Sequence, residues 1–314
     1  MPQPPKPDVF AAFDPILHKA DLATSPWVKG RYVPDLDLLR ELLSVPIRTG
    51  EKQESGRVAK AFDAWVAHEL RRAGFPPDGV WPRSRRPRVL PDDAAPLEQG
   101  LADLAQALAE AETDGNRLKP PKLRKAIRAL EGKLPGASEA YILGDFYAKQ
   151  IDVTISSWRR GPDVLVSTKT MFSSYRKNLK NRHEEAVGEV MSLRARHPMA
   201  AMGYAYLVRR NVFEEEGAYA ILYDILDRLR RPGQAFDATL LLVADWDEGA
   251  ETPQVTSIDQ PSDLLDASRF FEDIIEHVLD RSPIKEHVEA RRRREPEPVG
   301  GLPDEADPAD DADE

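Results

Sequence analysis

The sequence predicts an α/β fold in which helices cover a central mixed sheet. Two runs rich in β-branched and apolar residues, 149–155 and 163–169, flank a short segment with Gly161 and Pro162, a pattern typical of two strands joined by a turn. Strand-like and helix-like segments then alternate through the second half of the chain, which favours a sheet with helices packed on it. With 314 residues, 41% of them apolar, the chain can form one large or two ordinary domains around a sizeable core.

The first half of the chain is predicted to be mainly helical. Leucines recur at helical spacing within 36–43. Residues 56–74 give a stronger amphipathic pattern, and Gly74 is expected to end that helix. Two further helices, 97–112 and 122–133, separate it from the predicted hairpin.

The second half supplies the remaining elements of the predicted sheet and its cover. In chain order they are a helix that starts near Ser173 and ends at about Arg196, a strand at 199–208, a helix at 214–231, a strand at 238–246 and a helix at 262–281. Ser262 is the expected N-cap of the last helix, because its hydroxyl can accept a free backbone N–H of the first turn.

Composition excludes several classes of protein. The chain has no cysteine, which rules out disulfides, thiolate metal sites and a cysteine nucleophile, and which fits a cytoplasmic location. No run approaches the roughly 20 apolar residues of a membrane span, and residues 1–7 do not form an apolar signal segment. Neither a phosphate-binding P-loop nor a GxSxG nucleophile motif is present, and the six histidines form no zinc-binding pair.

The formal net charge of −10 is unevenly distributed. Residues 301–314 carry seven acids and no base, which leaves −3 for the rest of the chain. A nearly neutral chain with local basic clusters is compatible with nucleic-acid binding, because the electrostatic field near a cluster matters more than the net charge of the chain. One basic cluster is the run of four arginines within 83–88, which is either a solvated loop or a phosphate contact.

The predicted hairpin carries the polar residues of greatest interest. Alternation along the second strand places Ser167 and Lys169 on one face and Thr168 on the other. If the two strands pair antiparallel, Asp152 of the first strand lies near Ser167 and Lys169. A surface salt bridge is the simplest interpretation of this arrangement.

The residues Gln150-Ile151-Asp152, followed by a turn and Ser167-Thr168-Lys169, resemble the hairpin of the PD-(D/E)xK nuclease superfamily. In that family the hairpin carries an aspartate and then an acid-x-lysine motif. The resemblance implies that Asp152 is a metal ligand and that Lys169 is the catalytic lysine. Ser167 stands where the family usually has a second carboxylate, and a hydroxyl is a weak ligand for Mg²⁺.

The helix at 56–74 is similar to the first helix of the same family, and Asp63 matches the acidic residue of that helix. The resemblance covers 56–74 and 149–281, and it implies a restriction-endonuclease-like α/β fold. The expected regions are an N-terminal helical arm at 1–55, a nuclease-like domain at 56–285 with a helical insertion at about 91–140, and a tail at 286–314 whose acidic composition predicts disorder.

The helix after the hairpin has a basic part and an acidic part. The basic part mixes cations, which bind phosphates, with amides, which can bond base edges: Arg176, Lys177, Asn178, Lys180, Asn181 and Arg182. The acidic part contains Glu185 and Glu189. Several restriction enzymes of the family place the missing carboxylate on this helix, so Glu185 or Glu189 is a candidate replacement for the acid absent at Ser167. An ordinary charged helix is the alternative.

The function implied by the resemblance is Mg²⁺-dependent hydrolysis of DNA phosphodiester bonds by an endonuclease of the restriction or phage-defence type. The expected metal ligands are Asp152 and Glu185, and Ser167, Lys169, Asp63 and Glu189 complete the catalytic set. The expected partner is double-stranded DNA, with a homodimer if both strands are cut and with no membrane association. Two alternatives stay open, namely an inactive nuclease-fold module that binds nucleic acid or a partner, and a structural subunit.

Overall fold

The structure is a computed structural model that describes residues 8–50, 56–85, 88–90, 94–113, 120–131, 140–157, 159–231 and 233–295. Its helices are α1 (Asp14–Leu17), α2 (Leu36–Arg48), α3 (Arg57–Arg72), α4 (Ala95–Thr113), α5 (Pro120–Glu131), α6 (Tyr175–Arg196), the 3-10 helix η2 (Arg210–Phe213), α7 (Ala218–Leu229), α8 (Ala267–Arg281) and α9 (Val288–Arg294). Its strands are β1 (Trp27–Val28), β2 (Arg31–Tyr32), β3 (Val80–Trp81), β4 (Ala140–Leu143), β5 (Ala148–Ile151), β6 (Val153–Ser157), β7 (Gly161–Met171), β8 (Ala201–Arg209), β9 (Ala238–Trp246) and β10 (Val255–Asp259).

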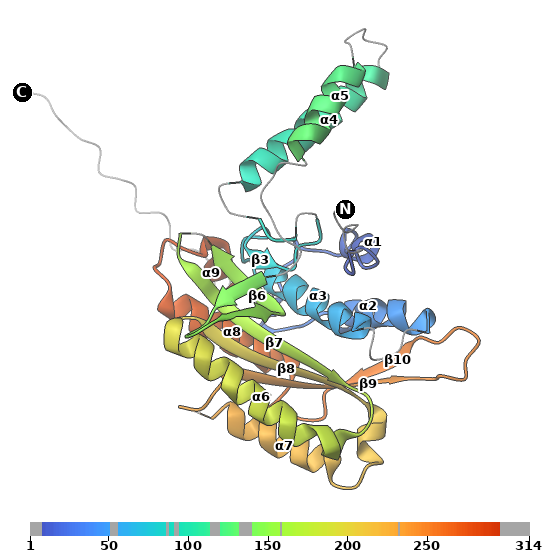
Figure 1. The fold of residues 1–314 in the computed structure, drawn as a ribbon, viewed down its shortest axis with the longest axis vertical. Coiled ribbons are helices and arrows are strands. Elements are labelled where there is room, and N and C mark those ends of the chain that lie inside the picture. The colour runs from blue at the N-terminus through green and yellow to red at the C-terminus, as the bar shows by residue number, and fades with distance from the viewer. Residues whose placement is uncertain are drawn as a thin grey trace, which may run out of the picture.

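A six-stranded mixed sheet forms the centre of the molecule (Figure 1), and its strand order is β10-β9-β8-β7-β6-β3. The strands β7, β8 and β9 run parallel, whereas β6, β3 and β10 are antiparallel to their neighbours. Parallel strands are buried on both faces, which explains why β8 and β9 are almost continuous apolar runs. The predicted α/β class, with helices flanking a mixed sheet, is confirmed.

Alternation along the strands divides the apolar side chains between two cores. Val164 and Val166 of β7 face the core that contains α2, α3 and α8, whereas Leu165 faces the core that contains α6 and α7. The sheet therefore has helices packed on both of its faces, and successive residues of β7 point alternately toward one core and the other.

The N-terminal arm is part of the first core. Phe13, Tyr32 and Leu39 are almost fully buried in it, and the ring of Tyr32 lies 5.2 Å from the ring of Phe271 in α8. The α2 helix begins because the side chain of Asp35 accepts the backbone N–H of Leu38. Residues 8–50 are thus continuous with the domain that the sequence placed at 56–285.

The helices α4 and α5 pack against each other and project from the body of the molecule (Figure 1). The helices predicted at 97–112 and 122–133 are confirmed within the described residues. An ion pair between Arg83 and Glu98 ties the base of α4 to the segment that follows β3.

The predicted hairpin is confirmed as β6 paired antiparallel with β7, but the prediction of its first strand is partly wrong. The expected strand at 149–155 breaks at Asp152. Residues before the break form β5, which pairs with β4 in a separate two-stranded sheet. Asp152 therefore lies where the chain passes from the small sheet to the large one.

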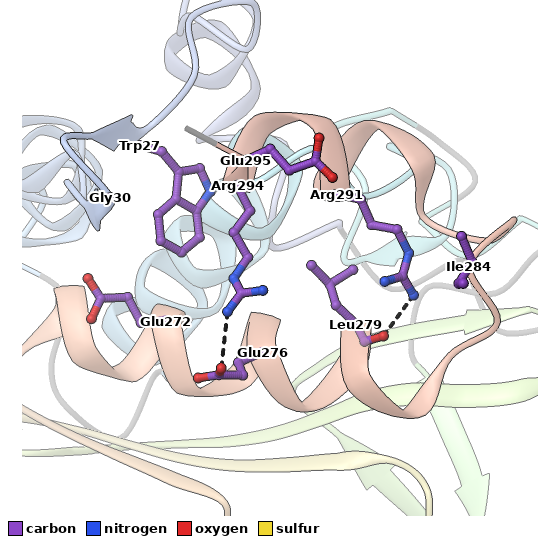
Figure 2. Close-up of a pocket in the computed structure, with 9 residues that line it drawn as sticks. All are labelled: Trp27, Gly30, Glu272, Glu276, Leu279, Ile284, Arg291, Arg294 and Glu295. Carbon is purple, nitrogen blue, oxygen red and sulfur yellow. Dashed lines mark hydrogen bonds and ion pairs between the residues drawn. The ribbon is translucent and has the colours of Figure 1, made fainter. Parts of the chain in front are cut away.

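Two predicted boundaries near the C-terminus are also wrong. The N-cap of α8 is Asp266, whose side chain accepts the backbone N–H of Arg269 at 2.7 Å, and Ser262 lies outside the helix. Helix α9 occupies part of the segment assigned to a tail from 286 onward, and it docks on α8 through Arg291 and Arg294 (Figure 2). Residues 296–314 of that predicted tail lie outside the described residues.

None of the helices in the described ranges combines the length and the apolar composition that a bilayer crossing requires.

Candidate functional site

The carboxylate of Asp152 is held against the strand β7. Its Oδ2 accepts the backbone N–H of Thr168 at 3.0 Å and the hydroxyl of Ser167 at 3.4 Å. The pairing of Val153 with Val166 fixes this contact, because it brings the bend before β6 next to residues 167 and 168. The side chain of Asp152 is 25% exposed, so the carboxylate remains accessible from solvent.

Lys169 completes the predicted group. Its ammonium donates to the Ser167 hydroxyl at 3.1 Å, and Ser167 and Lys169 share a face of β7 as the alternation predicts. Within the described residues the structure records no direct ion pair between Lys169 and Asp152, so the simple surface salt bridge is not the observed arrangement. The Ser167 hydroxyl lies between the two charged groups.

Asp63 joins this group from the opposite face of the sheet. The hydroxyl of Thr168 donates a short hydrogen bond to its carboxylate, and the Asp63 side chain is 1% exposed. Burial raises the pKa of Asp63 to about 6, Lys60 opposes this shift, and the nearby charge of Asp152 adds to it. Thr168 therefore links the two carboxylates, through its backbone to Asp152 and through its side chain to Asp63.

Lys60 is the site residue that the sequence reasoning missed. Its ammonium lies 2.8 Å from Oδ2 of Asp63 and 4.0 Å from Oδ1 of Asp152, and 5.7 Å from the ring centroid of Phe10. A pattern could have indicated the first contact, since Lys60 and Asp63 are three residues apart on one helix. We name Lys60, Asp63, Asp152, Ser167, Thr168 and Lys169 the Asp152 cluster.

Of the two candidate glutamates on α6, the structure brings Glu189 to the Asp152 cluster. Glu189 lines a small cavity together with Ser167, and it interacts electrostatically with Lys169 and Asp152. Burial raises the pKa of Glu189, while the positive charge of Lys169 opposes the shift. Glu185, the expected metal ligand, instead has its half-exposed carboxylate paired with Arg182 at 2.7 Å.

The oxygen donors of the Asp152 cluster suit a hard cation. Asp63 and Asp152 come from different elements, and the Lys60 ammonium lies 2.8 Å from the first carboxylate and 4.0 Å from the second, so the two carboxylates share one cationic neighbour. Mg²⁺ is commonly held by one or two carboxylates and several waters. In the part of the chain that the structure describes, no group of three or more acidic or histidine side chains is arranged for a metal ion.

The basic part of α6 is only partly available to a ligand. Arg176 and Lys177 are exposed, and no ion pair is recorded for their side chains within the described ranges. The side chain of Asn178 donates to the carbonyl of Ser174. Lys180 lies 3.8 Å from Glu184, Arg182 pairs with Glu185, and Asn181 is exposed. Among the predicted DNA contacts, Arg176 and Lys177 are therefore the most available cations.

Two of the arginines within 83–88 bind acidic side chains of the protein itself. Arg88 is buried and binds Asp8 at 2.7 Å and Asp14 at 3.0 Å, and Arg83 binds Asp78 at 2.7 Å as well as the acid on α4. The phosphate-contact interpretation is therefore wrong for Arg83 and Arg88. Arg85 is exposed, and residue 86 lies outside the described residues.

A separate cleft of about 590 Å³ lies between Gly30, which follows β1, and the helices α8 and α9 (Figure 2). Trp27 and Arg294 face it, and Arg294 is paired there with Glu276 at 3.0 Å. None of its lining residues belongs to the Asp152 cluster. We therefore assign the candidate site to the Asp152 cluster, where carboxylates and a lysine converge.

No protein-family model, no curated protein and no solved structure matches this chain.

Proposed function

We propose that the chain is a Mg²⁺-dependent DNA endonuclease of the restriction or phage-defence type, with a restriction-endonuclease-like fold. One observation carries the proposal: the carboxylates of Asp152 and Asp63, from separate elements, meet on the two sides of Thr168, next to Lys169. In metal-dependent phosphodiester hydrolysis, carboxylates hold the metal ion and a nearby cationic side chain stabilises the charge that develops on the phosphate.

In this proposal each member of the Asp152 cluster has a distinct task. Asp152 and Asp63 would hold Mg²⁺ in place of the Lys60 ammonium, and the bound ion would neutralise phosphate charge and lower the pKa of a water. Lys169 would orient the attacking water and stabilise the negative charge that develops on the phosphate. Glu189 would supply the acid that is missing at Ser167.

The proposed substrate is double-stranded DNA. Arg176 and Lys177 would bind backbone phosphates, so affinity would fall steeply as the salt concentration rises. Cleavage of both strands at one site would call for a symmetric pair of active sites, which a homodimer provides.

The test is a plasmid-cleavage assay with Mg²⁺, with Mn²⁺ and with EDTA. We expect Asp152→Ala and Lys169→Ala each to lower the cleavage rate by at least about 100-fold, while DNA binding in EDTA persists. A gel-shift assay measures that binding. Cleavage at the wild-type rate by both variants would refute the proposed site.

The acid on α6 is tested by a matched pair of substitutions. We expect Glu189→Gln to reduce cleavage by at least about 100-fold, because Glu189 lines the cavity at Ser167. Glu185→Gln removes an equal charge one helical turn away and is expected to change the rate by less than about 3-fold. Equal effects of the two substitutions would contradict the role of Glu189.

A second candidate function is a nuclease-like module that binds nucleic acid without cutting it. Two observations favour it: a serine stands at position 167, and the Lys60 ammonium lies against both carboxylates. DNA binding in the gel-shift assay, with no cleavage in either Mg²⁺ or Mn²⁺, would identify this module.

A further inference from the structure

Five arginines line a cleft of about 720 Å³ that is separate from the Asp152 cluster. They come from the C-terminal part of α6, from the segment directly after α7, and from both ends of α8: Arg194, Arg230, Arg231, Arg269 and Arg281. Clefts of this size commonly hold small molecules. The arginines are far apart in sequence, so only the fold brings them together.

The cleft carries an excess of positive charge. Five guanidinium groups face two lining carboxylates, those of Asp237 and Asp273. Arg231 also pairs at 2.6 Å with Asp227, which does not line the cleft. Even when Asp227 is counted, positive charge remains in excess, and the cleft is suited to an anion.

Most of these arginines are loosely paired. Arg281 lies 3.6 Å from Asp237, and Arg230 and Arg269 lie 3.5 and 3.9 Å from Asp273. These distances exceed the roughly 2.7–2.9 Å of a strong charge-assisted hydrogen bond. The guanidinium groups therefore keep donors that an anion can use.

Asp237 has a structural task in the cleft. Its carboxylate accepts the backbone N–H of Met202 at 2.8 Å and a hydrogen bond from Arg194 at 3.1 Å. It thus fixes Arg194 at the wall and leaves that side chain with further donors. Asp237 therefore both positions Arg194 and neutralises part of the positive charge of the cleft.

Two of the arginines have unsatisfied donors. The Nε of Arg194 and the Nη1 of Arg281 are shielded from solvent, and neither has a hydrogen-bond partner within the described residues. Both side chains also line the open cleft. A rotation of either guanidinium group toward a bound anion would give its donors oxygen partners.

We propose that this arginine cleft binds a ligand that carries two or more phosphate groups. A guanidinium group is planar and presents parallel N–H donors, which match the oxygens of a phosphate better than a lysine ammonium does. Five such groups from three parts of the chain can surround more than one phosphate. The proposal concerns binding alone and does not depend on nuclease activity.

The experiment is isothermal titration of the full chain with pyrophosphate, in EDTA and at low salt. We expect Arg230→Ala/Arg269→Ala to weaken binding by at least about 10-fold. The control Arg228→Ala/Arg292→Ala removes two charges from exposed arginines outside the cleft, and we expect it to change affinity by less than about 2-fold. Thermal unfolding verifies that both double variants are folded.

Further arms of the experiment separate the charge from its geometry and identify the source of the phosphate. Arg230→Lys/Arg269→Lys keeps the charge but loses the planar donors, so we expect intermediate affinity. If a short DNA duplex competes with pyrophosphate for the cleft, the natural phosphates are those of nucleic acid. If it does not compete, they belong to a small molecule. Absence of pyrophosphate and duplex binding, or equal weakening by both alanine pairs, would overturn the proposal.

Discussion

The substitution Lys60→Met tests whether the Asp152 cluster is built to hold a cation. It removes the ammonium that lies 2.8 Å from Asp63 and 4.0 Å from Asp152, and it keeps most of the volume of the side chain. Loss of one partner from a buried ion pair costs about 3–5 kcal/mol in unfolding free energy. Lys60 is 25% exposed, so we expect a loss near the lower end, about 3 kcal/mol, when EDTA is present.

Magnesium ions should reverse most of that loss. If the two carboxylates then bind Mg²⁺, a concentration about 100-fold above Kd restores about 2.7 kcal/mol. The wild-type chain should gain less, because its own ammonium competes for the same carboxylates. Urea unfolding of both proteins, with EDTA and with Mg²⁺, measures the four free energies.

A matched control is Lys180→Met, which removes an 82% exposed ammonium and should shift stability by less than about 0.5 kcal/mol in either condition. Equal stabilisation of the wild type and Lys60→Met by Mg²⁺ would refute a cation site at the two carboxylates. Equal stability of Lys60→Met and the wild type in EDTA would refute the stabilising role of the Lys60 ammonium.

The remaining predictions concern the frame around the site. Burial lowers the pKa of His68 to about 3, so the folded state binds fewer protons than the unfolded state below about pH 6.5, and stability falls as pH falls. From about pH 7 to pH 5, His68 should lower the free energy of unfolding by about 2 kcal/mol. Urea unfolding of His68→Gln should show a fall that is smaller by this amount. The same pH dependence in His68→Gln and the wild type would contradict this prediction. Gly74 has φ +99°, and an added Cβ would lie 2.8 Å from the backbone N of Ala290, so Gly74→Ala should destabilise by more than about 2 kcal/mol. The control is Gly161→Ala, at φ +82° with no atom near the added Cβ, which should cost only the backbone strain of about 1–2 kcal/mol. Equal urea midpoints for Gly74→Ala and Gly161→Ala would argue against the close contact between Gly74 and Ala290 of α9.

The sheet and its helices were largely predictable because their signals are local. The apolar alternation of β6 and the continuous apolar runs of β7, β8 and β9 indicate burial directly. The break at Asp152 was not predictable in this way. A strand pattern gives the faces of a strand but not its partner, and residues on either side of Asp152 pair with different sheets.

The cap of α8 shows a second limit of local patterns. Ser262 and Asp266 are both good N-cap residues and lie four positions apart. The structure uses Asp266, while the chain before it pairs its backbone elsewhere, as in the bond from the Leu265 N–H to the Ser262 carbonyl. Propensity could not separate two equivalent caps without the packing of the helix that follows.

The convergence of Asp152, Ser167 and Lys169 was predictable from strand register, whereas the role of Lys60 was not. Its contact with Asp152 joins residues 92 positions apart and exists only because α3 packs on the sheet. The two acids that bind the buried Arg88 lie 74 and 80 positions away, so a cluster of arginines in the sequence could not show whether these side chains bind protein or phosphate.

The outer strands of the large sheet limit how this protein can associate. On one side the sheet ends in β3, which has two residues, and on the other in β10, which has five and an irregular register with β9. A partner that adds a strand needs a long, regular row of unpaired backbone groups, and short or bulged borders discourage such growth. Within the described residues neither border of this sheet offers such a row, so a partner strand is not expected to extend the large sheet.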